Sequence, residues 1–409
     1  MLLNYFRKCC IGFSYGLSFP LTLMVLDFWL KDSGISNTII GFFTLLHLPF
    51  TLKFIWGVLV ENYDVPYLTP RIDRNRSWII VSHIMLIVGI IGMAYSNPSS
   101  NIAQLVFFAS LTALGDGCKS VVLYPYQIHG VTKNQLGYVA SLVNLGHKCG
   151  MIFTKVLTLH LAYFFSWRTA YLSAAIAVLL LMILILFIKS PPQHKEETLS
   201  GGFTLVLSNS IKKSLITPFL KMIKKREGIH VLSILMLYKS ADFMMQKMSR
   251  PFLLEIGFSK LEIANIVQLF GAISVAIGGL VGGYFIKKIG VSRAMIYCGL
   301  GHAASFFLYV LLAKTGAVPQ ILWFVIFCEA LTGGSVTSAF IAFIYTICQT
   351  GSMYALCWAL HEISGIFFMS ISGIVVDNIG WSLYFMLVSL FYTAVLIVLR
   401  RRHKNLAVE

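Results

Sequence analysis

Two pairs of oppositely charged residues stand three positions apart inside long apolar stretches of the sequence. Lys239 precedes Asp242, and Asp116 precedes Lys119. Side chains three positions apart lie on one face of a helix, so each pair can form an ion pair. A charged side chain at the centre of a bilayer costs ~2.5–3.5 kcal/mol even on a lenient scale, so it needs a partner or a watery cavity. We predict switchable pairs whose lysines can bind an anionic ligand; the alternative is that each pair only neutralises itself.

Other ionisable residues extend this candidate site. Lys148 follows Gly146 and His147 on another apolar stretch, where it can bind an anionic group or brace the Asp116 pair. Glu329 can carry a proton in apolar surroundings, or it can be held by a neighbouring lysine. A second group lies near the end of the second apolar stretch and in the loop after it, where it would act in gating: Lys53, Glu61 and Arg71.

The composition is that of a membrane protein. Of the 409 residues 57% are hydrophobic and 12% are charged, and the mean hydropathy is +0.80. Soluble proteins carry about 25% charged residues, so soluble enzymes and nucleic-acid-binding proteins are excluded for the chain as a whole. The net charge of +16 comes from short basic segments between apolar runs, which is the pattern that orients membrane proteins.

The apolar runs predict an all-α membrane protein with twelve transmembrane helices in two six-helix bundles. The bundles would occupy residues 1–189 and 229–409, joined by a cytoplasmic linker, 190–228, with an amphipathic helix over 211–226. With both termini in the cytoplasm, roughly 21 of the Lys and Arg residues are cytoplasmic and roughly 5 external. The twelve segments are 9–30, 38–60, 77–95, 101–125, 137–161, 169–189, 229–248, 262–286, 294–313, 319–344, 352–376 and 380–399.

The two halves also repeat a short motif. Gly34-Ile-Ser36 precedes the second segment, and Gly257-Phe-Ser259 precedes the eighth, its counterpart in the other half. This order of six helices, a long central loop and six more helices resembles the major facilitator superfamily. In that superfamily two helix bundles rock about a site near the middle of the membrane.

Specific motifs resemble a narrower family, the AmpG-type muropeptide permeases. One departure lies on the fourth segment, where Ser120 and Tyr124 stand in place of that family's acids. The matching motifs run from the second segment to the twelfth: 41–46, 52–56 with Glu61, 237–239 with Asp242, 329–334, 337–340 and 380–385.

The resemblance implies a proton symporter of the bacterial inner membrane. Such permeases import anhydromuropeptides (N-acetylglucosaminyl-1,6-anhydro-N-acetylmuramyl peptides), which are anionic glycopeptides, for peptidoglycan recycling. The resemblance also implies that the protein is a monomer in the lipid bilayer. Its partners would be protons and a small-molecule substrate, and it would not bind nucleic acid. The altered fourth segment leaves two alternatives: another anionic sugar, nucleotide or acyl-thioester metabolite as cargo, or a sensor that does not transport.

No enzyme chemistry is predicted. The sequence has no nucleophile with an adjacent base, no phosphate-binding Gly-x-x-x-x-Gly-Lys-Ser/Thr motif and no metal-ligand cluster at a recognisable spacing. We therefore expect neither a cofactor nor a metal.

Overall fold

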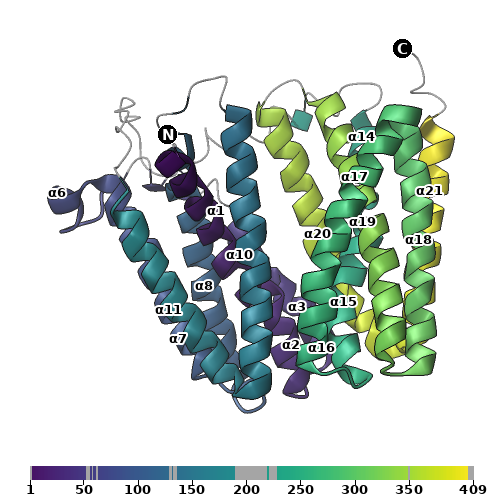
Figure 1. Cartoon of the computed structure of the whole chain (residues 1–409), viewed down its shortest axis with the longest axis horizontal. Coiled ribbons are helices and arrows are strands. Elements are labelled where there is room, and N and C mark those ends of the chain that lie inside the picture. The colour runs from purple at the N-terminus through teal and green to yellow at the C-terminus, as the bar shows by residue number, and fades with distance from the viewer. Residues whose placement is uncertain are drawn as a thin grey trace. The chain divides into compact units, whose positions relative to one another are not determined.

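The structure is a computed structural model, and in the part of the chain that it describes the regular secondary structure is helical, with no strand (Figure 1). It describes residues 2–51, 56–57, 59–60, 63–128, 131, 136–188, 219–220, 228–348 and 351–403. The predicted amphipathic helix over 211–226 lies outside the described residues, except for Phe219 and Leu220.

Within the described ranges, nine helices are long and apolar enough to cross a membrane. The other three predicted segments also fall on helices. Segment 38–60 begins as the short elements α3 (Asn37–Phe42), η1 (Phe43–His47) and α4 (Leu48–Thr51), and segment 137–161 is α10 (Leu136–Phe164). Segment 229–248 is interrupted between α14 (Gly228–Leu237) and α15 (Ser240–Glu255). The fold class predicted from the hydropathy pattern is therefore confirmed.

The first compact unit contains residues 1–34 and 45–211. Its first span is broken at Met24 into α1 (Leu2–Leu23) and α2 (Val25–Asp32), with Pro20 four residues before the break. The short α6 (Thr69–Ile72) precedes α7 (Arg74–Ala94), and the remaining helices are α8 (Ile102–Val122), α9 (Tyr124–Ile128), α10 and α11 (Trp167–Leu186).

Glycines let α1 and α10 pack backbone against backbone in this unit. A Cβ atom at Gly12 or Gly16 would collide with the carbonyl oxygen of Val143 or His147, and one at Gly146 would collide with that of Cys9. Small residues at a helix interface permit such close approach, which is how helices associate where lipid replaces water.

The second unit contains residues 35–44 and 212–409, so α3 belongs to it. Its helices after α15 are α16 (Lys260–Glu262), the π-helical η4 (Ile263–Phe270), α17 (Gly271–Ile289), α18 (Val291–Thr315), α19 (Pro319–Ile347), α20 (Gly351–Ile379) and α21 (Trp381–His403). The helix α18 packs against α19 and α21, and α17 packs against α19 (Figure 1).

The repeated glycine–serine motif has the same local structure in both places. Gly34 and Gly257 have φ angles of 77° and 104°, which glycine adopts without the penalty that a Cβ imposes. Ser36 and Ser259 then cap the N-termini of α3 and α16 with their side-chain oxygens. The internal repeat expected from the sequence is thus present in the backbone.

Candidate functional site

The second unit holds the Lys239–Asp242 pair at the break between α14 and α15. Lys239 is the residue before α15, and Asp242 lies in the first turn of that helix, where the helix dipole favours a carboxylate. The Nζ atom of Lys239 lies 2.9 Å from Oδ2 of Asp242 and donates to the hydroxyl of Thr337 at 3.0 Å. Gln246 donates to the same carboxylate oxygen at 3.1 Å. The lysine side chain is 11% exposed, so it is buried but not sealed.

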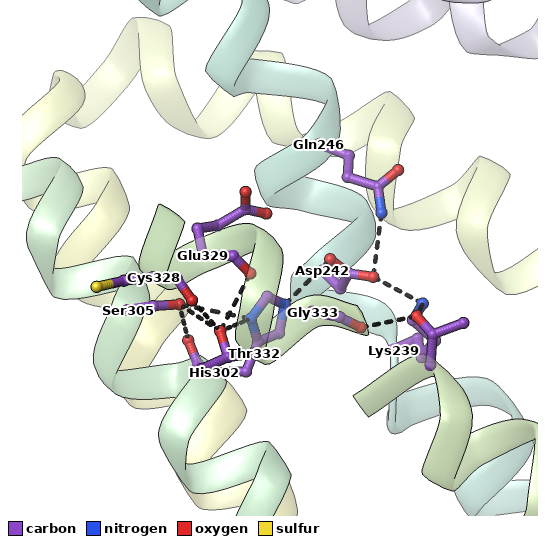
Figure 2. A network of polar contacts seen from close by, with 10 residues as sticks. Lys239, Asp242, Gln246, His302, Ser305, Cys328, Glu329, Thr332 and Gly333 are labelled. Carbon is purple, nitrogen blue, oxygen red and sulfur yellow. Dashed lines mark hydrogen bonds and ion pairs between the residues drawn. The ribbon is translucent and has the colours of Figure 1, made fainter. Parts of the chain in front are cut away.

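His302 on α18 contacts the other oxygen of this carboxylate (Figure 2). Its Nε2 atom lies 3.2 Å from Oδ1 of Asp242, and its Nδ1 atom lies 2.9 Å from the hydroxyl oxygen of Thr332 on α19. Glu329, one turn before Thr332, completes the group. One ligand atom from each of Asp242, His302 and Glu329 lies within 4.8 Å of the other two.

Such a group could hold a cation or share protons, and its surroundings favour protons. The carboxylate of Asp242 is already in contact with Lys239, Gln246 and His302. The ammonium of Lys239 places a positive charge beside it. A metal ion at this place would be repelled by the positive charge of Lys239. It would also need oxygens of Asp242 as ligands, and both oxygens already contact other side chains.

The first unit holds the Asp116–Lys119 pair on α8. The Nζ atom of Lys119 lies 2.8 Å from Oδ1 of Asp116 and donates to the carbonyl oxygen of Ser14 at 2.8 Å. The hydroxyl of Ser18 on α1 contacts both the lysine and the carboxylate. Because the lysine side chain is 1% exposed, this pair is more enclosed than the Lys239 pair.

The family's altered positions lie next to this network. Tyr15 donates to the carbonyl oxygen of Ser120 at 2.9 Å and accepts a hydrogen bond from Gln127 at 2.6 Å. Tyr124, at the start of α9, is exposed. Partly buried hydrogen bonds of Tyr15 on α1 with Ser120 on α8 and Gln127 on α9 therefore lie where AmpG-type permeases carry acids.

The remaining predicted residues lie elsewhere or outside the description. Lys148 is exposed on α10, and Arg71 is exposed on α6. In the loop of Arg71, ion pairs are made by its neighbours: Arg74 with Asp64 at 2.7 Å and Arg76 with Asp73 at 3.7 Å. Lys53 and Glu61 lie outside the described residues.

Sequence reasoning missed His302 and Ser18. His302 is the only Asp, Glu, Lys, Arg or His within predicted segment 294–313, and that isolation was an available signal. Ser18 had no comparable signal, because serine is common in helices and its role depends on α1 facing α8.

The fold and buried ion pairs are those of a membrane transporter, and the comparisons agree. The sequence profile of the Major Facilitator Superfamily matches residues 9–360, and the chain belongs to this superfamily. It is 28% identical over 392 residues to "Putative transporter AmpG 3" of Rickettsia prowazekii (strain Madrid E), covering 93% of this chain and 91% of the relative. It is 25% identical over 381 residues to "Anhydromuropeptide permease" of Escherichia coli (strain K12), covering 92% of this chain and 75% of the relative.

Solved structures support the same fold. The nucleoside transporter NupG superposes with a TM-score of 0.72 at 11% identity, covering 98% of both chains. The xylose transporter XylE from E. coli superposes with a TM-score of 0.64 at 14% identity, covering 99% of this chain and 98% of that chain. At these identities the likeness shows the fold alone. The protein is thus a multi-pass membrane transporter with the resemblance to AmpG proteins that its motifs indicated.

Proposed function

We propose that this transporter imports anhydromuropeptides in symport with protons. The observation that carries the proposal is the buried Lys239–Asp242 pair, found in a chain whose relatives include an anhydromuropeptide permease. An anhydromuropeptide carries carboxylates on its peptide stem, and a carboxylate can compete with Asp242 for the ammonium of Lys239. Exchanging one anionic partner for another leaves the lysine paired at each stage, which avoids a bare charge inside the membrane.

The membrane setting follows from the charge pattern. We propose that the protein lies in the bacterial inner membrane as a monomer, with both termini in the cytoplasm. Residues 1–189 and 229–409 form the two bundles, and the basic segment 190–228 joins them on the cytoplasmic side. Lys53, Glu61 and Arg71 would then belong to the cytoplasmic gate, while Asp116, Lys119, Lys148 and Glu329 would belong to the substrate or proton pathway.

A second candidate is the same transport cycle with a different anionic cargo. The observation that favours it is Ser120 and Tyr124 at the positions where the resembling family has acids, beside a Lys119 already held by Ser14 and Ser18. An anionic sugar, a nucleotide or an acyl-thioester metabolite would still pair with Lys239. A protein that binds such a ligand without moving it is the remaining alternative.

The proposal is tested by uptake of radiolabelled anhydromuropeptide into proteoliposomes with and without an inward proton gradient. We expect gradient-dependent accumulation in the wild type and its loss in Lys239→Ala. Lys314→Ala, which removes an exposed lysine from the last turn of α18, is the matched control and should transport normally. Uptake at the same level with and without the proton gradient would contradict proton coupling. If the muropeptide is neither bound nor transported, the cargo assignment fails, and competing anionic sugars and nucleotides become the next ligands to assay.

A further inference from the structure

The two ring nitrogens of His302 face different kinds of partner. Nδ1 lies 2.9 Å from the hydroxyl oxygen of Thr332, which can donate its one hydrogen to Nδ1 or direct it to the carbonyl oxygen of Cys328, 2.7 Å away, and accept from Nδ1. The hydroxyl of Ser305 lies 2.7 Å from the carbonyl oxygen of His302, to which it can donate, and 3.4 Å from Nδ1. On its other side, Nε2 faces Oδ1 of Asp242, and an ionised carboxylate only accepts. The bond to Asp242 therefore needs a hydrogen on Nε2, whereas Thr332 can face Nδ1 without a hydrogen, in the neutral ring, or with one, in the imidazolium.

Protonation of His302 changes what holds Asp242. A neutral ring that carries its hydrogen on Nε2 gives Asp242 an uncharged donor beside Lys239 and Gln246. With an imidazolium, Asp242 gains a second cationic partner, as it lies 2.9 Å from Lys239 and 3.2 Å from His302. One carboxylate then neutralises two cations, so one positive charge remains available to an anion.

Glu329 offers a route for the proton. It is less buried than Asp242 and His302, and its carboxylate has no hydrogen bond or ion pair with any residue that the structure describes (Figure 2). When His302 is neutral and Glu329 is ionised, the group made by Lys239, Asp242, His302 and Glu329 has one more negative than positive charge. Each proton that it binds makes it more favourable for an anionic ligand.

The surroundings of His302 leave few other titratable groups. Its charged neighbours are Asp242 and Lys239 at the start of α15 and Glu329 on α19. The helix α21 contributes the ring of Tyr392, 6.2 Å away between centroids. The helix α17 carries its titratable residues only in its last two turns, at Tyr284, Lys287 and Lys288.

We propose that His302 is the proton-binding switch of the second unit: a second proton on the ring makes it a cationic partner of Asp242 and frees Lys239 to bind an anionic group of the cargo. The proton comes from water by way of Glu329, the ring nitrogen without a hydrogen accepts it, and it returns to water after the cargo leaves. This inference rests on the proposed symport and names its proton-binding residue.

The first test needs no cargo. Nuclear magnetic resonance of the full chain in lipid nanodiscs, with ¹⁵N-labelled histidine rings, reports whether each ring nitrogen carries a hydrogen. The His302 signals, assigned by their absence in His302→Gln, should change from one protonated nitrogen to two as the pH is lowered. A ring that stays singly protonated throughout would overturn the proposal.

The second test measures coupling in proteoliposomes with the radiolabelled anhydromuropeptide. His302→Gln keeps a group that can donate to Asp242 but cannot titrate, so it should still exchange labelled for unlabelled cargo at equilibrium. It should lose accumulation driven by a proton gradient and the pH dependence of exchange. Accumulation equal to that of the wild type would overturn the proposal.

Controls separate a coupling role from a structural one. His361→Gln changes a buried histidine of α20, packed among the rings of Phe243, Phe340 and Trp358, and should keep gradient-driven accumulation. If His302→Gln does not fold, Thr332→Val retains the ring but removes the hydroxyl oxygen that accepts from Nδ1 in the imidazolium, and should weaken the pH dependence of exchange. An unchanged dependence would count against the proposal. If the wild type moves no muropeptide, the cargo assignment fails, and the histidine spectra alone still decide whether His302 binds a proton.

Discussion

Asp116 and Lys119 form an ion pair one turn apart on α8, with 2.8 Å between Oδ1 and Nζ and the lysine side chain 1% exposed. The lysine also donates to a backbone carbonyl of α1, and Ser18 contacts both charges. Lys239 and Asp242 have the same spacing in the second unit, but their lysine is 11% exposed and, among the residues that the structure describes, bonds only a threonine hydroxyl besides the acid. The first pair thus ties α1 to α8, whereas the second is better placed to exchange partners.

Breaking the Asp116–Lys119 pair on one side should destabilise the protein strongly. Asp116→Asn or Lys119→Met alone leaves one buried charge without its partner, which typically costs about 3–5 kcal/mol. The double variant removes both charges and should recover most of this loss. Thermal unfolding in detergent, followed by tryptophan fluorescence, measures all three. If the double variant loses the sum of the two single losses, the charges are not coupled.

Gly16 on α1 should tolerate no side chain, since a Cβ there would collide with the backbone of α10 at His147 and Met151. Gly16→Ala must move the helices apart and should cost about 1–3 kcal/mol of stability, as overpacking usually does. Gly283→Ala on α17 is the matched control, because a Cβ there meets nothing within 4 Å. Equal melting temperatures for the two variants would contradict the close approach of α1 and α10.

Asp377 near the end of α20 should stabilise the N-terminus of α3. Its carboxylate accepts from Asn37 at 2.8 Å and from the backbone amide and hydroxyl of Thr38 at 2.7 Å each. Asp377→Ala leaves these donors without the carboxylate and should cost about 1.5–3 kcal/mol, the range for hydrogen bonds to a charged group.

The comparison for Asp377→Ala is Asp64→Ala, which removes an exposed acid paired with Arg74. An exposed ion pair contributes about 0–1 kcal/mol, so this variant should unfold close to the wild type. Chemical denaturation of both variants in the same detergent distinguishes the two cases. Equal losses would mean that the carboxylate of Asp377 does not hold α3.

Local patterns in the sequence were enough to predict the spans, the repeat and the pairing partners. Hydropathy over about 20 residues follows from the thickness of the bilayer, and a spacing of three residues fixes a helix face whatever lies around it. The capping serines Ser36 and Ser259 are equally local. These features depend on neighbours in the chain, which a sequence displays directly.

The third members of the two charge networks could not be predicted in this way. Ser18 is 98 residues from Asp116, and His302 is 60 residues from Asp242, so each contact depends on which helices pack together. The break at Lys239 was also missed, because neither proline nor glycine marks it. Packing between distant helices decides these features.

Gln246 should tune the charge beside Lys239. It donates to Oδ2 of Asp242 at 3.1 Å, and its side chain is exposed. Gln246→Glu places a second carboxylate beside the first, holds Lys239 more strongly and should weaken binding of an anionic cargo by about tenfold, equivalent to about 1.4 kcal/mol. Protonation removes the added charge, because two adjacent carboxylates resist being ionised together, so the defect should shrink as the pH falls.

Gln246→Met loses the hydrogen bond without adding charge, and its affinity should lack this extra pH dependence. Binding of radiolabelled anhydromuropeptide to both variants across pH measures the difference, and a Gln246→Glu defect that grows on acidification would contradict a lysine held by competing carboxylates.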